Sequence, residues 1–283
     1  MKDVVVARRF TGAIRARTAM ESRRKQYMKM PVLFVGHGSP MNIILKNDFT
    51  KHMSELGKQL PRPEAIMVIS AHWLTEGTYV TCAEHPRQIY DFYGFPEELY
   101  RIKYNCAGSP RHAALTKKAA KGTEINCSAE WGLDHASWAI LKHIYPKADI
   151  PVYELSLDVN RDLAFHYNLG RELESLRREG ILIIGSGNIV HNLHLFDFDT
   201  DATPENWVVE IDEKMKNCLL ENNHVALIDY LKLDARIKLA VPTLDHYLPM
   251  LYILGMQEQK DKLRFVHEGC QNKTISMRSF ILE

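Results

Sequence analysis

The stretch PVLFVGHGSP, residues 31–40, decides the fold. Consecutive apolar residues run into Gly-His-Gly, which is the pattern of a strand buried on both faces that ends in a loop. The same pattern returns in AIMVISAHW, residues 65–73, and in ILIIGSGNIVHN, residues 181–192. We therefore predict three buried strands that carry His37, His72 and His191 at or just beyond their carboxyl ends.

The rest of the chain alternates strand and helix patterns around these three segments. Further strands are expected at residues 79–85 as an edge, at 151–158, and as two antiparallel closing strands in LRFVHEG and TISMRSFIL. Residues 86–110 read as a long loop with a short helix. Helices are expected at 48–60 with Asp48 as N-cap, 111–121, 131–145, 161–179 ended by Gly180, 207–222, 225–233 and, after a loop, within 241–255. This order predicts one α/β domain with a mostly parallel central sheet flanked by helices.

Composition excludes several classes of protein. The 283 residues are 46% hydrophobic and 25% charged with a formal net charge of +1, so no overall field favours nucleic acid. No apolar run reaches the roughly 20 residues that span a bilayer. The five cysteines are scattered, which disfavours a disulfide framework or a thiolate zinc site and favours a reducing, cytoplasmic location. They are Cys82, Cys106, Cys127, Cys218 and Cys270.

The first 29 residues differ from the remainder. They hold nine Lys and Arg residues against Asp3 and Glu21. A basic leader of this kind is typical of a targeting segment, but no cleavage site or hydrophobic stretch supports secretion. We favour a poorly ordered extension or a start codon placed too far upstream, with the catalytic domain at residues 30–283.

The histidines carry most of the functional information. Ligands of open α/β sheets bind beyond the carboxyl ends of the strands, so His37, His72 and His191 could share one crevice. His246 opens an apolar helix and could reach the same crevice from the side. Any one of them alone is more often structural, but the joint pattern predicts a metal site, and converging imidazoles favour zinc or iron.

His135 is a separate candidate. It lies in GLDHASW at a helix start, between Trp131 and Trp138. A helix N-terminus disfavours the imidazolium, so a neutral imidazole there could serve in acid–base chemistry or as a hydrogen-bond donor. Packing against the tryptophans is the alternative.

Several long blocks in a fixed order resemble one known family. Together they resemble the LigB-like class III extradiol ring-cleavage dioxygenases, and within them the DOPA-dioxygenase branch. The blocks cover residues 30 to about 280, which is nearly all of the chain after the leader. They are PVLFVGHGSPMN (31–42), PRPEAIMVISAHW (61–73), IYDFYGFPEELY (89–100), GLDHASWAILKHIYP (132–146), GILIIGSGNIVHNL (180–193) and TLDHYLPMLYILG (243–255).

The resemblance implies roles for the candidate residues. It implies one divalent metal held by His37, His72 and His246. His191 is implied at the metal, either as a fourth ligand or as the catalytic acid–base, and the block of His135 is implied to line the substrate pocket. Better-known members use two histidines and one glutamate, whereas the third position here is His246. Fe(II) is expected for turnover, and Zn(II) is plausible in the protein as found.

The implied reaction opens the ring of a catechol-type aromatic such as DOPA and inserts both atoms of dioxygen to give a semialdehyde. His191 and His135 are the expected catalytic groups. Tyr90, Phe92 and Tyr93 are expected to form an aromatic wall, with lid packing as the alternative. Asp91 could meet a substrate amine or cap the turn. A small aromatic substrate and dioxygen are the expected partners of a monomer or small homo-oligomer.

Three other interpretations stay open at this point. A zinc-dependent hydrolase or amidase suits imidazole ligands, but such a site usually includes a carboxylate base, and no HExxH pair is present. The motif GHGS after an apolar first strand also fits the class II chelatases, but the resemblance to that family stops there. A non-catalytic metal-binding protein on the same fold is the third.

Overall fold

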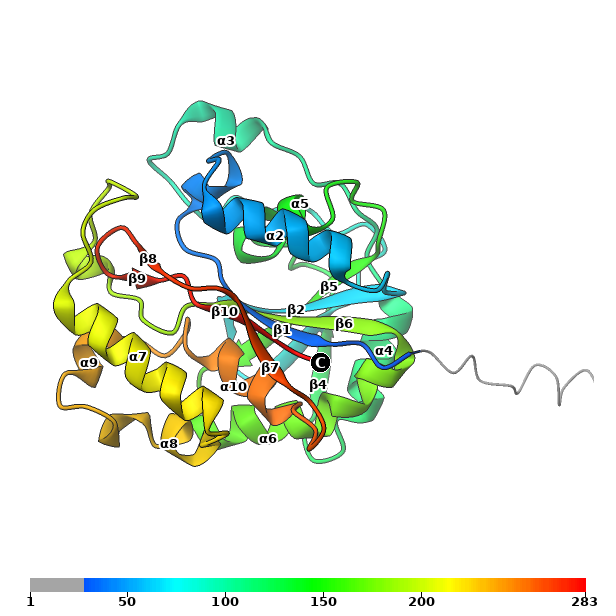
Figure 1. Cartoon of the computed structure of the whole chain (residues 1–283). Coiled ribbons are helices and arrows are strands. Elements are labelled where there is room, and N and C mark those ends of the chain that lie inside the picture. The colour runs from blue at the N-terminus through cyan, green and yellow to red at the C-terminus, as the bar shows by residue number, and fades with distance from the viewer. Residues whose placement is uncertain (1–27) are drawn as a thin grey trace, which may run out of the picture.

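The central sheet has eight strands in the order β4-β3-β5-β2-β6-β1-β10-β7, and the computed structural model describes residues 28–283 around it (Figure 1). Its centre, β5-β2-β6-β1, is parallel, whereas β10 and β7 add antiparallel strands at one edge. The predicted fold class is confirmed. The strands are β1 Val32–Gly36, β2 Ala65–Thr75, β3 Thr78–Thr81, β4 Ile125–Ser128, β5 Val152–Asp158, β6 Ile181–Gly187, β7 Leu263–His267 and β10 Ser279–Leu282, with β8 Cys270–Gln271 and β9 Ile275–Ser276 as a separate pair.

Helices cover both faces of the sheet. Helices α2 and α5 lie on one face, and α6 and α10 lie on the other (Figure 1). The α-helices are α2 Asp48–Gln59, α3 Glu97–Arg101, α4 Pro110–Ala119, α5 His135–Ile144, α6 Leu163–Leu173, α7 Asn206–Leu220, α8 His224–Ile228, α9 Ile237–Ala240 and α10 Leu248–Gly255. Short 3₁₀ turns are η1 Pro40–Ile43, η2 Glu174–Glu179, η3 Leu193–Leu195 and η4 Tyr230–Lys232.

Alternation along β1 explains why its sequence is continuously apolar. Val32 and Phe34 join the core cluster beneath α6 and α10, and Leu33 and Val35 join the cluster beneath α2 and α5. Successive side chains of a strand point to opposite faces, so a strand covered on both faces needs apolar residues at every position. Each fully buried Leu or Phe contributes roughly 1.5–3 kcal/mol through apolar surface removed from water.

Two predicted helix details are corrected by the structure. The N-cap of α2 is Asn47 rather than Asp48, because the Asn47 side chain accepts from the Thr50 amide while the Thr50 hydroxyl accepts from the Asn47 amide. The predicted helix over 161–179 is divided into α6 and η2. The tighter η2 turns accompany a fully buried Arg177, which pairs with Asp261. Gly180 ends this segment with φ 75°, as expected.

The predicted edge strand is also corrected. β3 lies inside the sheet, and the edge is β4, a four-residue strand too short to show a clear alternation in the sequence. Contrary to the expectation from their scatter, Cys82 and Cys127 form a disulfide. They are 45 residues apart in the chain and meet because β3 and β4 pair in parallel, with Val80 opposite Cys127.

The predicted N-terminal extension falls mostly outside the described residues, which begin at residue 28. Lys29 already pairs with Asp261, and the Met30 amide donates to the Arg177 carbonyl at 2.9 Å. Among residues 28–283, no helix combines the length and the apolar character required to cross a membrane.

Candidate functional site

Three of the predicted ligands converge. His37, His72 and His246 present ring nitrogens that all lie within 4.8 Å of one another. Nε2 of His72 lies 3.3 Å from Nε2 of His37, and the His246 ring centroid lies 5.1 Å from each of the other two. Two nitrogens bound at 2.0–2.1 Å to a tetrahedral ion are separated by roughly 3.3 Å. The spacing therefore suits three ligands of one ion.

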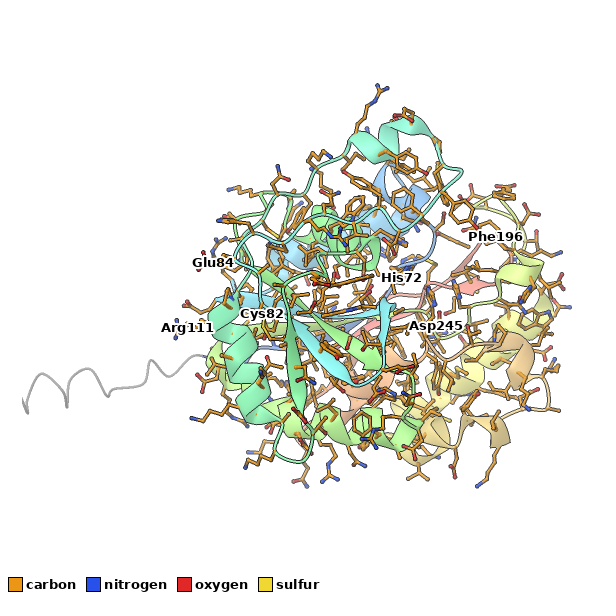
Figure 2. The ribbon with its side chains drawn as sticks, turned by 180° about the vertical axis from the view of Figure 1, so that it is seen from behind. His72, Cys82, Glu84, Arg111, Phe196 and Asp245 are labelled. Carbon is orange, nitrogen blue, oxygen red and sulfur yellow. A yellow bond between two sulfur atoms is a disulfide. The ribbon has the colours of Figure 1, made fainter. Side chains whose placement is uncertain are left out.

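The fold brings the three rings together at the carboxyl ends of the parallel strands. His37 directly follows β1, whereas His72 lies within β2, at the break in its pairing with β5 between Ile69 and Leu74. β2 thus continues past the histidine that was expected to end it. Figure 2 labels His72 and Asp245, the residue before His246, which come from two distant segments of the chain.

Gly187 lets the segment that carries His246 approach β6. A Cβ at this position would lie 2.2 Å from the His246 carbonyl oxygen, which no side chain could tolerate. The same carbonyl accepts from the Asn188 amide at 2.9 Å. The Gly-Ser-Gly motif at the end of β6 is therefore needed for close backbone contact, which fixes the position of His246.

The hydrogen bond on His37 fixes its tautomer. Nδ1 of His37 lies 3.0 Å from Oγ of Ser186. The Ser186 hydroxyl donates to the Ala136 carbonyl at 2.7 Å, so its oxygen is left to accept from the imidazole. With the proton on Nδ1, Nε2 carries the lone pair, and it lies 3.3 Å from Nε2 of His72.

Carboxylates fix the other two tautomers in the same way. Nδ1 of His72 lies 2.7 Å from Oδ2 of Asp91, and Nδ1 of His246 contacts Oδ2 of Asp245. An ionised carboxylate only accepts, so both imidazoles carry their proton on Nδ1. Burial lowers the pKa of His37 and of His246, which keeps both rings neutral near pH 7. Burial opposes charge at His72 as well, but its hydrogen bond to Asp91 raises the pKa.

Asp91 connects the three converging imidazoles to His135. Its Oδ2 also accepts from Nδ1 of His135 at 2.9 Å, and its Oδ1 accepts from the His135 amide at 2.9 Å, at the start of α5. Burial opposes ionisation, but the hydrogen bonds from His135 and His72 hold the pKa of Asp91 well below its ordinary value. These three residues also form a geometrically possible metal group. Separations of 2.7 and 2.9 Å are hydrogen-bond lengths, so we assign them to a supporting network.

His135 differs from the expectation of a donor. Burial lowers its pKa, so the ring is neutral. Because its single proton is on Nδ1 toward Asp91, the remaining Nε2 accepts hydrogen bonds. The ring lies edge-on to Phe92, with centroids 5.3 Å apart. Sequence reasoning placed His135 near the pocket, but its role as donor or acceptor depends on a partner 44 residues away.

His191 lies beside the three converging imidazoles, and its ring is parallel to that of His246. Its ring stacks on that of His246, with centroids 3.6 Å apart and planes inclined by 9°. In-plane lone pairs of two parallel stacked rings cannot both point at one ion. Within residues 28–283, the His191 amide donates to the Ala240 carbonyl at 2.9 Å while its ring nitrogens have no hydrogen-bond partner, and burial lowers the pKa of the ring well below the ordinary value. This geometry suits an acid–base group better than a fourth ligand.

A pocket of about 350 Å³ opens onto these histidines. Phe92 and Tyr93 line it as predicted, but Tyr90 does not. The Tyr90 hydroxyl donates to the Ile102 carbonyl at 2.6 Å, and its ring packs on Trp138. The opposite wall, which the sequence did not reveal, comes from the segment after His191. Its pocket-lining residues are Leu193, Phe196 and Phe198; Phe196 is labelled in Figure 2.

The family described as the catalytic LigB subunit of aromatic ring-opening dioxygenase matches residues 30–282. The chain belongs to the LigB family. The match covers all of the strands that position the three converging imidazoles, and it confirms the resemblance noted in the sequence. It also confirms the expectation that this chain is an enzyme of the extradiol ring-cleavage dioxygenase class.

Relatives of this LigB-family chain share one description. A protein of Escherichia coli K12 named 4,5-DOPA dioxygenase extradiol is 42% identical over 255 residues, which are 89% of this chain and 94% of that protein. A protein of the same name from Beta vulgaris is 33% identical over 87% of this chain and 94% of its own length. The crystal structure of an uncharacterized protein, JW3007, from Escherichia coli K12 aligns with a TM-score of 0.79 at 37% identity, covering 90% of this chain and 100% of that one.

Substitution Asp91→Asn tests the supporting network. In either orientation, the NH₂ group of the asparagine meets a donor: both imidazole N–H groups if it replaces Oδ2, or the His135 backbone amide if it replaces Oδ1. The negative charge that favours the two imidazole N–H donors is also lost. We expect the affinity for Zn(II) or Co(II) to fall about 10–100-fold, the usual cost of losing an outer partner of a ligating histidine. Competition with a chromogenic chelator measures it. Asp149→Asn, at an exposed carboxylate, is the control and should bind as the unmodified protein does. Unchanged affinity in Asp91→Asn would contradict the network.

Proposed function

We propose that this chain is a metal-dependent extradiol dioxygenase that opens the ring of a catechol-type aromatic, the class to which DOPA belongs. The bond that breaks joins one hydroxyl-bearing ring carbon to the adjacent ring carbon that carries no hydroxyl. One atom of dioxygen completes a new carboxyl group and the other a new aldehyde, so no external reductant is consumed. The observation that carries the proposal is the set of three imidazoles whose Nδ1 atoms all face oxygen partners, beside an aromatic pocket.

His37, His72 and His246 are the proposed ligands because one ring nitrogen of each lies within 4.8 Å of those of the other two, while each Nδ1 has an oxygen partner. A divalent, redox-active ion held there would favour a deprotonated catechol and let electron density pass from the ring to dioxygen. Asp91, Ser186 and Asp245 would orient the ligands. A cytoplasmic location and a monomer or small homo-oligomer stay predictions.

The remaining pocket residues would transfer protons and orient the substrate. We propose that a ring nitrogen of His191 accepts a catechol hydroxyl proton and later returns it, since this neutral ring lines the pocket and has no competing protein partner. Nε2 of His135 would accept from the second hydroxyl and so orient the substrate. Phe92, buried against His135, would exclude water on that side.

Metal replacement tests the function directly. Protein reconstituted anaerobically with Fe(II) is expected to consume oxygen with catechol and to form a yellow semialdehyde, whereas Zn(II) protein should show little turnover because zinc has no redox chemistry. An oxygen electrode and the product absorbance measure both. The control is the Fe(II) protein treated with a chelator, which should lose turnover. Hydrolysis of model esters or amides by the Zn(II) protein, without oxygen uptake by the Fe(II) protein, would instead favour the hydrolase.

A further inference from the structure

A second, much smaller cavity adjoins the substrate pocket. Its volume is about 10 Å³, against about 350 Å³ for the pocket. The two spaces share five lining residues, which are His37, Gly38, Ser39, Pro40 and His135. The other residues around the small space come from η1, α2 and α5, which pack together on one face of the sheet (Figure 1), and they are Asn42, Phe49, Ala139, Ile140 and His143. We call this space the inner cavity.

The polar side chains around the inner cavity are already hydrogen-bonded within the protein. The Asn42 side chain is bonded at both ends, to Gln271 at 2.8 Å and to Asn47 at 3.0 Å. Nε2 of His143 donates to the Asn42 carbonyl at 2.8 Å, and the Ser39 hydroxyl oxygen caps η1. A buried water molecule needs roughly two to four polar partners, so this space favours an apolar occupant over water.

The size of the inner cavity limits its occupant to a molecule of very few atoms. A cavity of roughly 10–15 Å³ has room for one water-sized molecule, so a catechol ring cannot enter. Cavities that stay dry bind small apolar species such as xenon. Of the two substrates of the proposed reaction, only dioxygen is both small and apolar.

The inner cavity reaches the three converging imidazoles through the rings of His37 and His135. The centroids of these two rings lie 5.8 Å apart. Nδ1 of His37 faces Ser186, and Nδ1 of His135 faces Asp91, so neither Nδ1 atom is free to hold a water molecule in the cavity. Nε2 of His37 lies 3.3 Å from Nε2 of His72. A small molecule in the inner cavity is therefore adjacent to the proposed ion site.

His143 separates the inner cavity from the protein surface. Its ring lines the cavity and also a surface groove of about 570 Å³. The groove is otherwise formed by residues 43–48 and by Thr50, Lys51 and Ser54. None of these residues lines the substrate pocket. A route thus leads from the groove, past His143 and through the inner cavity, to the imidazoles without crossing the aromatic pocket.

We propose that the inner cavity is a dioxygen-binding site, and that dioxygen reaches His37 through it, past His143, rather than through the substrate pocket. This inference rests on the proposed ring-opening function and adds a separate path for the second substrate. A bound catechol would fill the pocket between Phe92 and Phe196, whereas the route on the side of α2 and α5 would stay open. No bond forms or breaks in this step.

Xenon tests the inner cavity without turnover, because it is an apolar atom comparable in size to dioxygen. Crystals of the metal-free protein under xenon pressure are expected to show xenon bound against Phe49, Ala139 and Ile140. Ala139→Leu fills the space with a larger side chain and should abolish this binding. Ala114→Leu, at an exposed position of α4, is the matched control and should retain it. Xenon found only in the substrate pocket, or nowhere in the inner cavity, overturns the proposal.

Steady-state kinetics of the Fe(II) protein test the route. In Ala139→Leu, kcat/KM for dioxygen is expected to fall about fivefold or more, because passage through a close-packed interior then requires side chains to move. Ala139→Val should give a smaller fall and provides the test if leucine is not tolerated. Because Ala139 does not line the substrate pocket, kcat/KM for the catechol should stay close to that of the unmodified protein. Ala114→Leu should change neither value.

The two experiments distinguish this inference from the proposed function. Turnover by Ala139→Leu with an unchanged kcat/KM for dioxygen rejects the route and leaves ring opening intact. A lack of turnover by the unmodified Fe(II) protein with every catechol rejects the function instead. The xenon experiment uses metal-free protein, so it decides in either case whether the inner cavity admits an apolar gas.

Discussion

Alanine at position 37 is expected to abolish ring opening and to weaken metal binding more than a hundredfold. His37 is buried, and its Nε2 lies 3.3 Å from that of His72, so the substitution removes one of three converging lone pairs. Outer partners of ligating histidines contribute about 10–100-fold to metal affinity, and loss of a ligand should exceed that range. Chelator competition with Zn(II) and oxygen uptake with the Fe(II) protein measure the two effects.

The control for His37→Ala is a histidine away from the pocket. His85 is exposed, so His85→Ala changes the same residue type without reaching the three converging imidazoles. Circular dichroism of both variants shows whether the fold is retained. Folded His37→Ala protein that still binds Zn(II) with the affinity of the His85→Ala control would remove His37 from the ligand set.

Substitution His191→Ala is expected to lower kcat strongly and to change the metal affinity little. A positioned acid–base group contributes about 10²–10⁴-fold to rate, so kcat should fall by that factor. Metal affinity should change by less than about tenfold, because the stacked ring has no in-plane lone pair directed at the ion site. Steady-state oxygen uptake and chelator competition give the two numbers on the same Fe(II) or Zn(II) protein.

His191→Gln provides the matched comparison. It keeps a polar side chain of similar reach but cannot take up a proton near neutral pH, so turnover should stay low while metal affinity is retained. If instead alanine at position 191 loses metal as severely as alanine at position 37, His191 is a ligand first and the stacked arrangement does not persist in the metal-bound protein.

Much of the fold could be predicted because its signals are local. β1 and β6 are covered on both faces, so each begins with a continuous run of four apolar residues, VLFV and ILII. The predictions that failed also have physical reasons. β4 has four residues, too few to show an alternation, and Cys127 therefore gave no sign that it would lie beside Cys82.

The candidate site was predicted as residue types but not as a network. Histidines at strand ends are visible in a sequence because parallel strands place their carboxyl ends on one edge. Asp91 was noted only as a turn cap or amine partner, yet it accepts from both His72 and His135. The sequence does not reveal these two hydrogen bonds, because Asp91, His72 and His135 come from separate segments of the chain. Phe198 was missed for the same reason, and Tyr90 was assigned to a wall from which its ring turns away.

The sequence by itself determined the layered α/β architecture and the positions of the imidazoles along it, because both follow from patterns repeated over a few residues. Only the tertiary structure decided which nitrogen of each ring has an oxygen partner, and that His191 stacks on His246. It also decided which aromatic side chains line the pocket. The reason is that tautomer, ring orientation and pocket lining depend on side chains tens or hundreds of residues apart, whose meeting is set by packing across the whole sheet.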